Sequence, residues 1–279
     1  MKCVSTRRVA AVVVGALLLT ACRQVSKNTV DVTPSPTSQG SQKYEQLERE
    51  ARGAFLKDPR DVKTVEISAQ KYSEAIAIRA EDYESLWEAA RSCLWLACYG
   101  PEDQRKAYVQ RGLEYANTAV QVKPRGEEGL FYHGALAGRL AALDFSYSID
   151  GIKIIESRML QLIEAHSTYL YGGPDRVLAV LYMRAPAAPL GVGDYDKALI
   201  HMQRAVNVES HWLENQLYMA ELEFKLGKKH HDPALTKRAR GRLDKYFLNP
   251  GAKPPMATGS TYEFKEWRKD ARKLMETYA

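Results

Sequence analysis

Apolar residues recur three and four positions apart over most of this 279-residue chain. This spacing places them on one face of an α-helix, and the alternating pattern of a half-buried strand is nearly absent. The periodic segments are separated by clusters of Gly, Pro and polar residues, which divide the chain into roughly ten helices. The clusters are Asp58-Pro59, Tyr99-Gly100-Pro101, Lys123-Pro124, Gly172-Gly173-Pro174, Gly191-Val192-Gly193, Gly227-Lys228-Lys229, His231-Asp232-Pro233 and Asn249-Pro250. We therefore predict an all-α fold.

Three of these helices share a pattern of small residues. The second helix of a tetratricopeptide unit has a small residue, then a larger residue, an alanine and a proline at fixed spacing. Three segments fit approximately: Ser68, Tyr72, Ala75 and Ala80; Gly112, Ala116, Ala119 and Pro124; Ala198, Met202, Ala205 and Ser210. Each precedes another amphipathic helix, marked by Leu86, Ala89, Ala90 and Cys93; by Leu130, His133, Gly134 and Ala137; and by Gln216, Met219 and Ala220. We predict a degenerate tetratricopeptide-like array; the alternative is an irregular helical bundle.

One stretch breaks the period of these repeats. The residues from Asp144 to Tyr171 are rich in Ile, Leu and Met and lack the small residues of the repeat. We expect an insertion or an extended helix that closes over the array.

The N-terminus has the pattern of a bacterial lipoprotein signal. Lys2, Arg7 and Arg8 precede an apolar run from Val9 to Leu19, which is shorter than the ~20 residues that cross a bilayer. Leu19-Thr20-Ala21-Cys22 resembles a lipobox, whose cysteine receives acyl chains such as palmitate after cleavage. We predict a signal peptide over 1–21 and attachment to a membrane through lipid on Cys22.

Residues 22–43 are rich in Ser, Thr, Gln and Pro and have almost no large apolar side chain. Such a segment cannot bury enough surface to fold, so we predict a disordered tether that leads to a helical domain over 44–279. The lipid would hold this domain in the cell envelope, facing the periplasm. Arg23 stands where an Asp favours inner-membrane retention in some bacteria, so the outer membrane is the favoured location.

Charge and cysteine content narrow the function. The formal net charge of +6 includes three cationic residues of the signal peptide, and the remaining +3 gives no support to nucleic-acid binding. Cys3 leaves with the signal peptide and Cys22 is the lipidation site, so only Cys93 and Cys98 remain. They could form a disulfide if the helix ends between them, or remain two thiols on one helix.

The stretch from Tyr171 to Ala198 is unusually dense in Gly and Pro. Gly173-Pro174 is predicted to start a helix that Ala185-Pro186 ends, and Asp194 is placed to cap the next helix. We expect the loop from Pro186 to Gly193 to be rigid and close-packed.

This stretch resembles the TatT family of tetratricopeptide lipoproteins, which are associated with TRAP transporters. The similarity lies in the Gly-Gly-Pro-x-Arg opening, the Leu-Tyr before Ala-Pro, and the Leu-x-x-Gly-Asp-x-x-Lys-Ala close. The resemblance implies an envelope protein with cryptic repeats around a central opening, which binds small apolar ligands and associates with the solute-binding subunit of a tripartite transporter. We expect a binding module that supports uptake; the alternative is a scaffold for envelope assembly with no ligand of its own.

Five residues of this stretch are candidates for lining a ligand opening, with an arginine to hold a carboxylate and aromatic rings beside it. They are Tyr171, Arg176, Tyr182, Asp194 and Tyr195. The alternative is that they fix the Pro-rich loop to its helices. No catalytic motif occurs, and His230-His231-Asp232 is interpreted as a solvated turn instead of a metal site. We therefore predict no enzyme activity, no metal and no cofactor apart from the covalent lipid.

Overall fold

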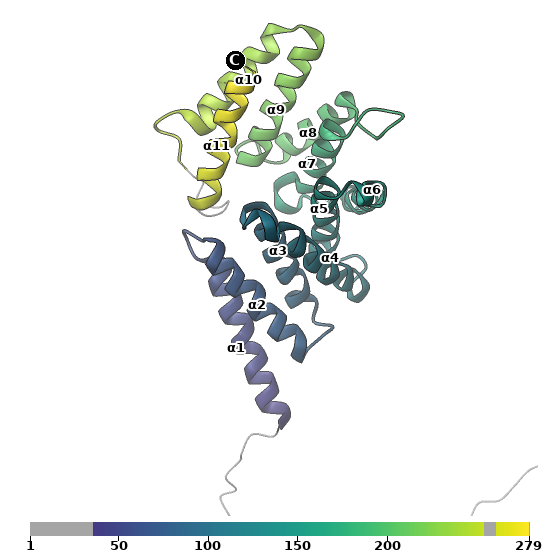
Figure 1. Ribbon diagram of the computed structural model, residues 1–279, viewed down its shortest axis with the longest axis vertical. Coiled ribbons are helices and arrows are strands. Elements are labelled where there is room, and N and C mark those ends of the chain that lie inside the picture. The colour runs from purple at the N-terminus through teal and green to yellow at the C-terminus, as the bar shows by residue number, and fades with distance from the viewer. Residues whose placement is uncertain (1–35, 254–260, 279) are drawn as a thin grey trace, which may run out of the picture. The chain divides into compact units, whose positions relative to one another are not determined.

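The computed structural model describes residues 36–253 and 261–278, with side chains described from residue 39 onward. The predicted signal peptide, lipidated Cys22 and tether up to Ser35 lie outside the described residues. In the described ranges all regular elements are helices, which confirms the all-α prediction (Figure 1). The α-helices are α1 (Pro36–Leu56), α2 (Val62–Ile78), α3 (Tyr83–Tyr99), α4 (Arg105–Val122), α5 (Glu127–Leu143), α6 (Ser148–Glu164), α7 (Tyr169–Arg184), α8 (Tyr195–Val208), α9 (Leu213–His230), α10 (Pro233–Leu243) and α11 (Thr261–Thr277). Short helical turns are η1 (Glu102–Gln104), η2 (Phe145–Tyr147) and η3 (Asp244–Leu248).

Aspartates set the start of several helices. The Asp61 carboxylate accepts from the backbone N–H of Thr64, and the Thr64 hydroxyl accepts from the N–H of Asp61, which forms a capping box for α2. Asp82 caps α3, and Asp232 caps α10 directly before Pro233. The polar clusters in the sequence therefore mark real helix boundaries.

The helices form consecutive pairs. In each pair an odd-numbered helix packs against the even-numbered helix that follows it, from α1 with α2 to α9 with α10. Successive pairs also pack against each other, and α3, α5, α7 and α9 contact one another in that order. Helix pairs that contact mainly their sequence neighbours form a solenoid. The prediction of a tetratricopeptide-like array is confirmed.

The predicted small residues lie where the helices approach most closely. Each of the three segments has its first three signature residues buried: Ser68, Tyr72 and Ala75; Gly112, Ala116 and Ala119; Ala198, Met202 and Ala205. At Gly112 a Cβ atom would lie 2.8 Å from Cβ of Cys93 and 2.9 Å from Cδ2 of Leu136. Only glycine allows α4 to fit between α3 and α5 at this distance.

The stretch from Asp144 to Tyr171 is neither an insertion nor an extended helix, which corrects our expectation. Most of it is α6, a 17-residue helix that packs between α5 and α7 like the second helix of any other pair. Its large residues are accommodated because the small residues lie on the partner helix: Gly134 of α5 faces Met159, and Gly138 faces Ile155. The series of helix pairs therefore continues through α6, although the sequence of α6 lacks the small residues of the repeat.

Helix α7 begins with a left-handed segment. Leu170, Tyr171 and Gly172 have φ angles of 48°, 57° and 81°, and regular helix follows from Gly173 with Pro174 in its first turn. The helix ends at Arg184, and the Asp194 carboxylate accepts from the N–H groups of Asp196 and Lys197 at 2.9 and 3.1 Å to cap α8. The predicted start, stop and cap are confirmed.

The loop from Pro186 to Gly193 is closed at its base but does not pack closely onto the helices. The N–H of Gly193 donates to the carbonyl of Pro186 at 2.8 Å, whereas residues 186–190 are exposed and Leu190 is 86% exposed. A Cβ at Gly193 would collide with the backbone of Ala185 and Pro186. The glycines let the loop close on itself, so its tip projects into solvent and the predicted close packing is wrong.

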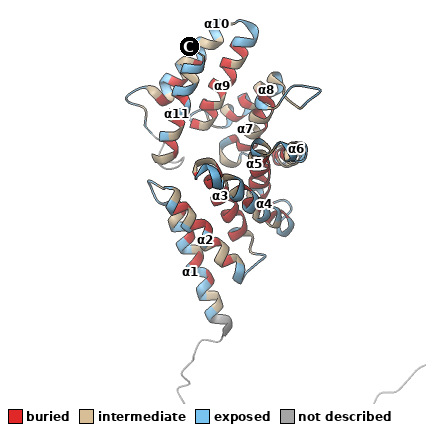
Figure 2. Cartoon of the chain, viewed as in Figure 1, coloured by how far each residue is buried: buried red, intermediate tan, exposed pale blue. Residues whose placement is uncertain are grey.

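The last helix returns to the first pair. The N–H of Thr261 donates to Asp58 at 2.9 Å, and the indole of Trp95 donates to the Glu263 carboxylate at 2.7 Å. Arg60 pairs with the same carboxylate at 3.3 Å, and the Tyr262 ring packs 5.3 Å from the Trp95 ring. The start of α11 therefore contacts the α1–α2 turn and α3, at the point where these elements approach in Figure 1. Figure 2 shows that buried residues are concentrated on α3, α5 and α9.

Two further expectations are decided at the N-terminal end. Helix α1 begins at Pro36, so the predicted tether of 22–43 extends too far. Contacts with α2 stabilise the start of this helix: the Arg79 guanidinium, just after α2, donates to the Ser41 hydroxyl at 2.8 Å and lies 3.9 Å above the Tyr44 ring.

Cys93 and Cys98 both lie within α3, which does not end between them, and both are free thiols.

Candidate functional site

The inner helices of the array are buried except along narrow stripes. From Ser85 to Ala97, the accessible residues of α3 are Arg91 and Leu94, and Cys98 continues the same stripe. From Leu213 to Gly227, the accessible residues of α9 are Glu214, Tyr218, Glu221 and Lys225. These positions are three or four residues apart, so each set lies on one face of its helix.

Helices α5 and α7 each add an arginine at the end of their accessible stripe. Arg139 of α5 donates from two nitrogens to the carbonyl of Ala97 at 3.2 and 2.9 Å. Arg184 of α7 makes a bidentate pair with the Glu221 carboxylate at 3.2 and 2.6 Å and lies 5.3 Å from the centre of the Tyr218 ring. The two arginines thus connect neighbouring inner helices.

Charged residues of neighbouring helices act on the stripes of α3 and α9. Burial raises the pKa of the Cys98 thiol, Arg139 of α5 lowers it, and Glu214 of α9 raises it. Burial also raises the pKa of Tyr218, and Glu214 raises it further. Cys98 is nevertheless partly accessible to solvent. The accessible stripe of α3 therefore lies in the electrostatic field of charged residues on α5 and α9.

We call the accessible residues of these four helices the inner surface. It consists of Arg91, Leu94, Cys98, Arg139, Arg184, Glu214, Tyr218, Glu221 and Lys225. Helix α11 borders it, since burial and Glu266 raise the pKa of Asp270 while Arg184 lowers it. Cationic and anionic residues alternate along the surface, with Leu94 and Tyr218 between them. This combination suits a protein segment that offers both charged and apolar groups.

Two of the predicted site residues lie at the start of α7 and serve the fold. The Arg176 guanidinium is buried and donates to the Asn215 side chain at 2.9 Å and to the carbonyl of Leu170 at 3.2 Å. It also pairs with Glu214 at 3.3 Å. The Tyr171 ring stacks on Trp212 with centroids 4.1 Å apart. The donors of Arg176 thus hold the left-handed segment against α9 and already have acceptors within the protein.

The other three predicted residues lie at the far end of α7 and at the start of α8. The Tyr182 hydroxyl donates to Glu156 of α6 at 2.9 Å, and Lys229 lies 5.4 Å from the centre of the Tyr195 ring. Asp194 caps α8, and its N–H donates to the carbonyl of Tyr182 at 2.8 Å. The five predicted residues therefore form two groups: Tyr171 and Arg176 hold the start of α7 against α9, whereas Asp194 caps α8 and contacts the end of α7.

Comparisons with known proteins support the fold. No protein-family model matches the chain, and no curated protein matches it. Among solved structures, it is similar to the crystal structure of a thermophilic tetratricopeptide-repeat protein from Thermus thermophilus, with a TM-score of 0.57 and 16% sequence identity. The match covers 84% of this chain and 99% of that chain. This chain thus has an all-α repeat fold of the tetratricopeptide type.

Two depressions on the described surface are lined mainly by charged residues. One is lined by Arg79, Ala80, Glu81 and Asp82 at the turn between α2 and α3, and another by Glu45, Glu48, Arg49 and Arg52 on α1. Both are open to solvent, so neither is an enclosed apolar cavity of the kind that holds a small apolar ligand. Over the described ranges, no group of three or more His, Cys, Asp and Glu side chains is arranged to hold a metal ion, and no helix is both long and apolar enough to cross a membrane.

The sequence analysis missed the inner surface. On α9, Glu214, Tyr218, Glu221 and Lys225 recur at helical spacing, but Asn215, Gln216 and Glu223 of the same helix are polar and buried. The pattern of polar residues therefore does not distinguish the accessible face of α9 from its buried face. The Gly- and Pro-rich stretch was more conspicuous, but its residues support the site and do not form it.

Proposed function

We propose that this chain is a lipid-anchored protein of the cell envelope whose helical array binds a protein partner on its inner surface. The observation that carries the proposal is that α3, α5, α7 and α9 contact one another in order and that each exposes charged or aromatic side chains. Arg184 of α7 and Tyr218 of α9 are among the accessible side chains. No catalytic role follows from this arrangement, and we propose none.

The finer proposal concerns the partner. On the resemblance of the Tyr171–Ala198 stretch to TatT proteins, we propose that the partner is the solute-binding subunit of a TRAP-type transporter. The mixed charges of Arg139, Arg184 and Glu221 suit such a protein surface better than an apolar molecule, which would take these charged groups out of water without offering them hydrogen bonds. Of the two activities that the resemblance implies, the inner surface therefore favours binding of a solute-binding subunit over binding of a small apolar ligand.

A second candidate is a scaffold for envelope assembly that has no ligand. The observation that favours it is the polar, open character of the two depressions on the described surface. Both candidates use the inner surface, so they differ in the identity of the captured protein.

The anchor is tested by replacing the lipidated cysteine. We expect the native chain to be in the membrane fraction and to incorporate labelled palmitate, and Cys22→Ala to abolish the label. A native chain that carries no label would contradict the lipid anchor and would leave the proposed role of the inner surface intact.

The inner surface is tested by photo-crosslinking in cells. A photoreactive residue is placed at Tyr218 and, as a matched control, at Ile200, which is 51% exposed on α8. We expect a discrete adduct from position 218 only, and Arg184→Glu should weaken that adduct at least tenfold while Arg204→Glu on α8 should not. A solute-binding protein in the adduct supports the transporter proposal, and an assembly protein supports the scaffold. Equal labelling at both positions, or none, would contradict a docking role for the inner surface.

A further inference from the structure

Charge is distributed unevenly along the chain. From Lys228 to the C-terminus there are thirteen lysines and arginines and six aspartates and glutamates, a net charge of +7, whereas the whole chain carries +6. Everything before Lys228 therefore has a slightly negative sum despite the cationic signal sequence. The net positive charge of the protein therefore lies in the segment from Lys228 onward.

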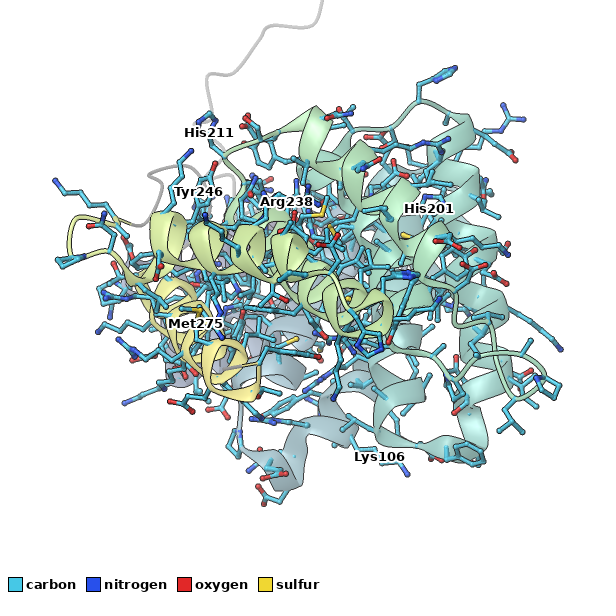
Figure 3. All side chains as sticks on the ribbon, turned by 90° about the horizontal axis from the view of Figure 1, so that it is seen from above. Lys106, His201, His211, Arg238, Tyr246 and Met275 are labelled. Carbon is cyan, nitrogen blue, oxygen red and sulfur yellow. The ribbon has the colours of Figure 1, made fainter. Side chains whose placement is uncertain are left out.

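The structure gathers these charges on the outer faces of two helices. In α10, Ala239 and Leu243 are buried, while Lys237, Arg238 and, in the following turn, Lys245 are exposed. In α11, Phe264, Trp267 and Ala271 are buried in the same apolar cluster, while the helix exposes Lys265, Lys269 and Arg272. The two helices contact each other, and Figure 3 marks them by Arg238 on α10 and Met275 on α11. We call Lys237, Arg238, Lys245, Lys265, Lys269 and Arg272 the basic face.

Much of this charge is not neutralised by the protein. Arg238 pairs with Glu223 at 2.8 Å but its side chain is 61% exposed, and Lys269 pairs with Glu266 at 2.6 Å. Within the described residues, Lys237, Lys265 and Arg272 make no ion pair. A cluster of exposed, unpaired cations creates a positive potential that attracts polyanions.

We propose that the basic face binds the anionic headgroups of the membrane that carries the lipid anchor. The inference rests on the proposed anchor, because a single lipidated residue holds the domain near the bilayer surface without fixing its orientation. Fully extended, the chain between Cys22 and Pro36 reaches about 50 Å at most, so Pro36 stays within that distance of the lipidated residue. Each cationic side chain near an anionic leaflet makes its own favourable contribution to the free energy of membrane binding.

The contact is electrostatic and does not require insertion. Phe264 and Trp267, the large apolar residues of α11, are turned inward against α9 and are unavailable to the acyl chains. Binding should therefore depend on salt and on the fraction of anionic lipid. A domain held by its lipid and by the basic face would present a fixed orientation to its partner.

The test measures binding to vesicles without the lipid anchor. The protein is the chain from residue 22 onward with Cys22→Ser, which retains the whole compact unit of residues 36–279. We expect co-sedimentation with phosphatidylglycerol vesicles at low salt, little with phosphatidylcholine vesicles, and loss of binding at high salt. The variant Lys237→Glu, Lys245→Glu, Lys265→Glu and Arg272→Glu should bind at least tenfold more weakly.

A matched control reverses four exposed cations elsewhere: Lys57→Glu, Lys63→Glu, Arg125→Glu and Lys153→Glu. It changes the net charge equally and should retain most of the binding, and circular dichroism confirms that both variants fold. Equal loss in both variants would overturn the proposal, because net charge would then explain binding. No binding of the unmodified domain to anionic vesicles would also overturn it and would leave an acidic protein as the other class of partner. Neither result affects palmitate labelling or crosslinking at position 218, which test the proposed function separately.

Discussion

Two junctions of the array occupy equivalent places but are held by different chemistry. In the first, α4 packs between α3 and α5 through Gly112, Ala116 and Ala119, all buried. In the second, α8 packs between α7 and α9, and the adjoining contact depends on Asn215 and Arg176, both buried and polar. One junction is an apolar close approach and the other is a hydrogen-bonded polar network.

The polar junction exists because the chain there leaves the helical path. The left-handed turn at Leu170, Tyr171 and Gly172 frees backbone carbonyls that a regular helix would use. The Asn215 amide donates to the carbonyls of Tyr171 at 3.0 Å and Ala205 at 2.9 Å, and its oxygen accepts from Arg176. Buried backbone groups need such partners, which explains why the polar residues Asn215 and Arg176 are buried at this junction.

The apolar junction should be the more sensitive to added volume. Gly112→Leu would force a side chain into the space occupied by Cys93 and Leu136, and we expect a loss of about 3 kcal/mol in the free energy of unfolding. Urea denaturation followed by circular dichroism measures it. Gly53→Ala is the matched control, because nothing lies within 4 Å of a Cβ there and the residue is exposed on α1. This control should stabilise the protein by about 0.5 to 1 kcal/mol, and an equal loss in both variants would show that the close approach is unimportant.

The polar junction should be sensitive to loss of its hydrogen bonds at unchanged size. Asn215→Leu removes one acceptor from the Arg176 guanidinium and the side-chain donor from the carbonyls of Tyr171 and Ala205, so we expect a loss of about 2 to 3 kcal/mol. The same denaturation experiment measures it. Asn117→Leu on the exposed face of α4 provides the same substitution without buried partners and should be nearly neutral. A neutral Asn215→Leu would mean that packing alone holds this junction.

The difference between the junctions also explains what the sequence could predict. Small residues at fixed spacing, such as Gly112, Ala116 and Ala119, are visible in the sequence because close packing demands the same residue types in every repeat. Asn215 and Arg176 stabilise a local backbone feature that occurs once, so no periodicity reveals them. For the same reason the contacts of Glu263 with Trp95 and Arg60, far apart in the sequence, could not be foreseen. The fold was therefore predictable from the sequence, whereas the inner surface had to be found from how the helices face one another.

The apolar side of the comparison includes a buried histidine. His133 of α5 is buried beside Arg158 of α6, whose Nε donates to its Nδ1 at 3.3 Å. Burial, and then the Arg158 charge, lower the pKa of His133 from 6.5 to about 4. The unfolded chain therefore binds a proton below pH 6.5 that the folded protein does not bind until about pH 4, so stability falls as pH falls through this window.

Between pH 7 and pH 5 this group alone should cost about 2 kcal/mol. Comparing the free energy of unfolding of the native protein and of His133→Gln at the two pH values isolates the contribution, because all other groups titrate in both. We expect the native protein to lose about 2 kcal/mol more than the variant. Equal losses would show that His133 is protonated in the folded state.

The smallest effect is expected where the array closes on itself. Glu263→Gln keeps a hydrogen-bond acceptor for Trp95 but removes the charge that pairs with Arg60, and we expect a loss of about 1 kcal/mol. Global unfolding is a poor measure of this loss, because the contact joins elements at the two ends of the array and its rupture need not unfold either. Hydrogen exchange resolves it: amides of α11 and of the α1–α2 turn should exchange faster together, while those of α5 remain protected. The control Glu266→Gln removes an ion pair that lies wholly within α11, with Lys269, and should leave the α1–α2 turn unchanged. If Glu263→Gln accelerated exchange in α11 alone, the contact between α11 and the α1–α2 turn would not stabilise that turn. The stacking of the helix pairs would then hold the array together without help from its last helix.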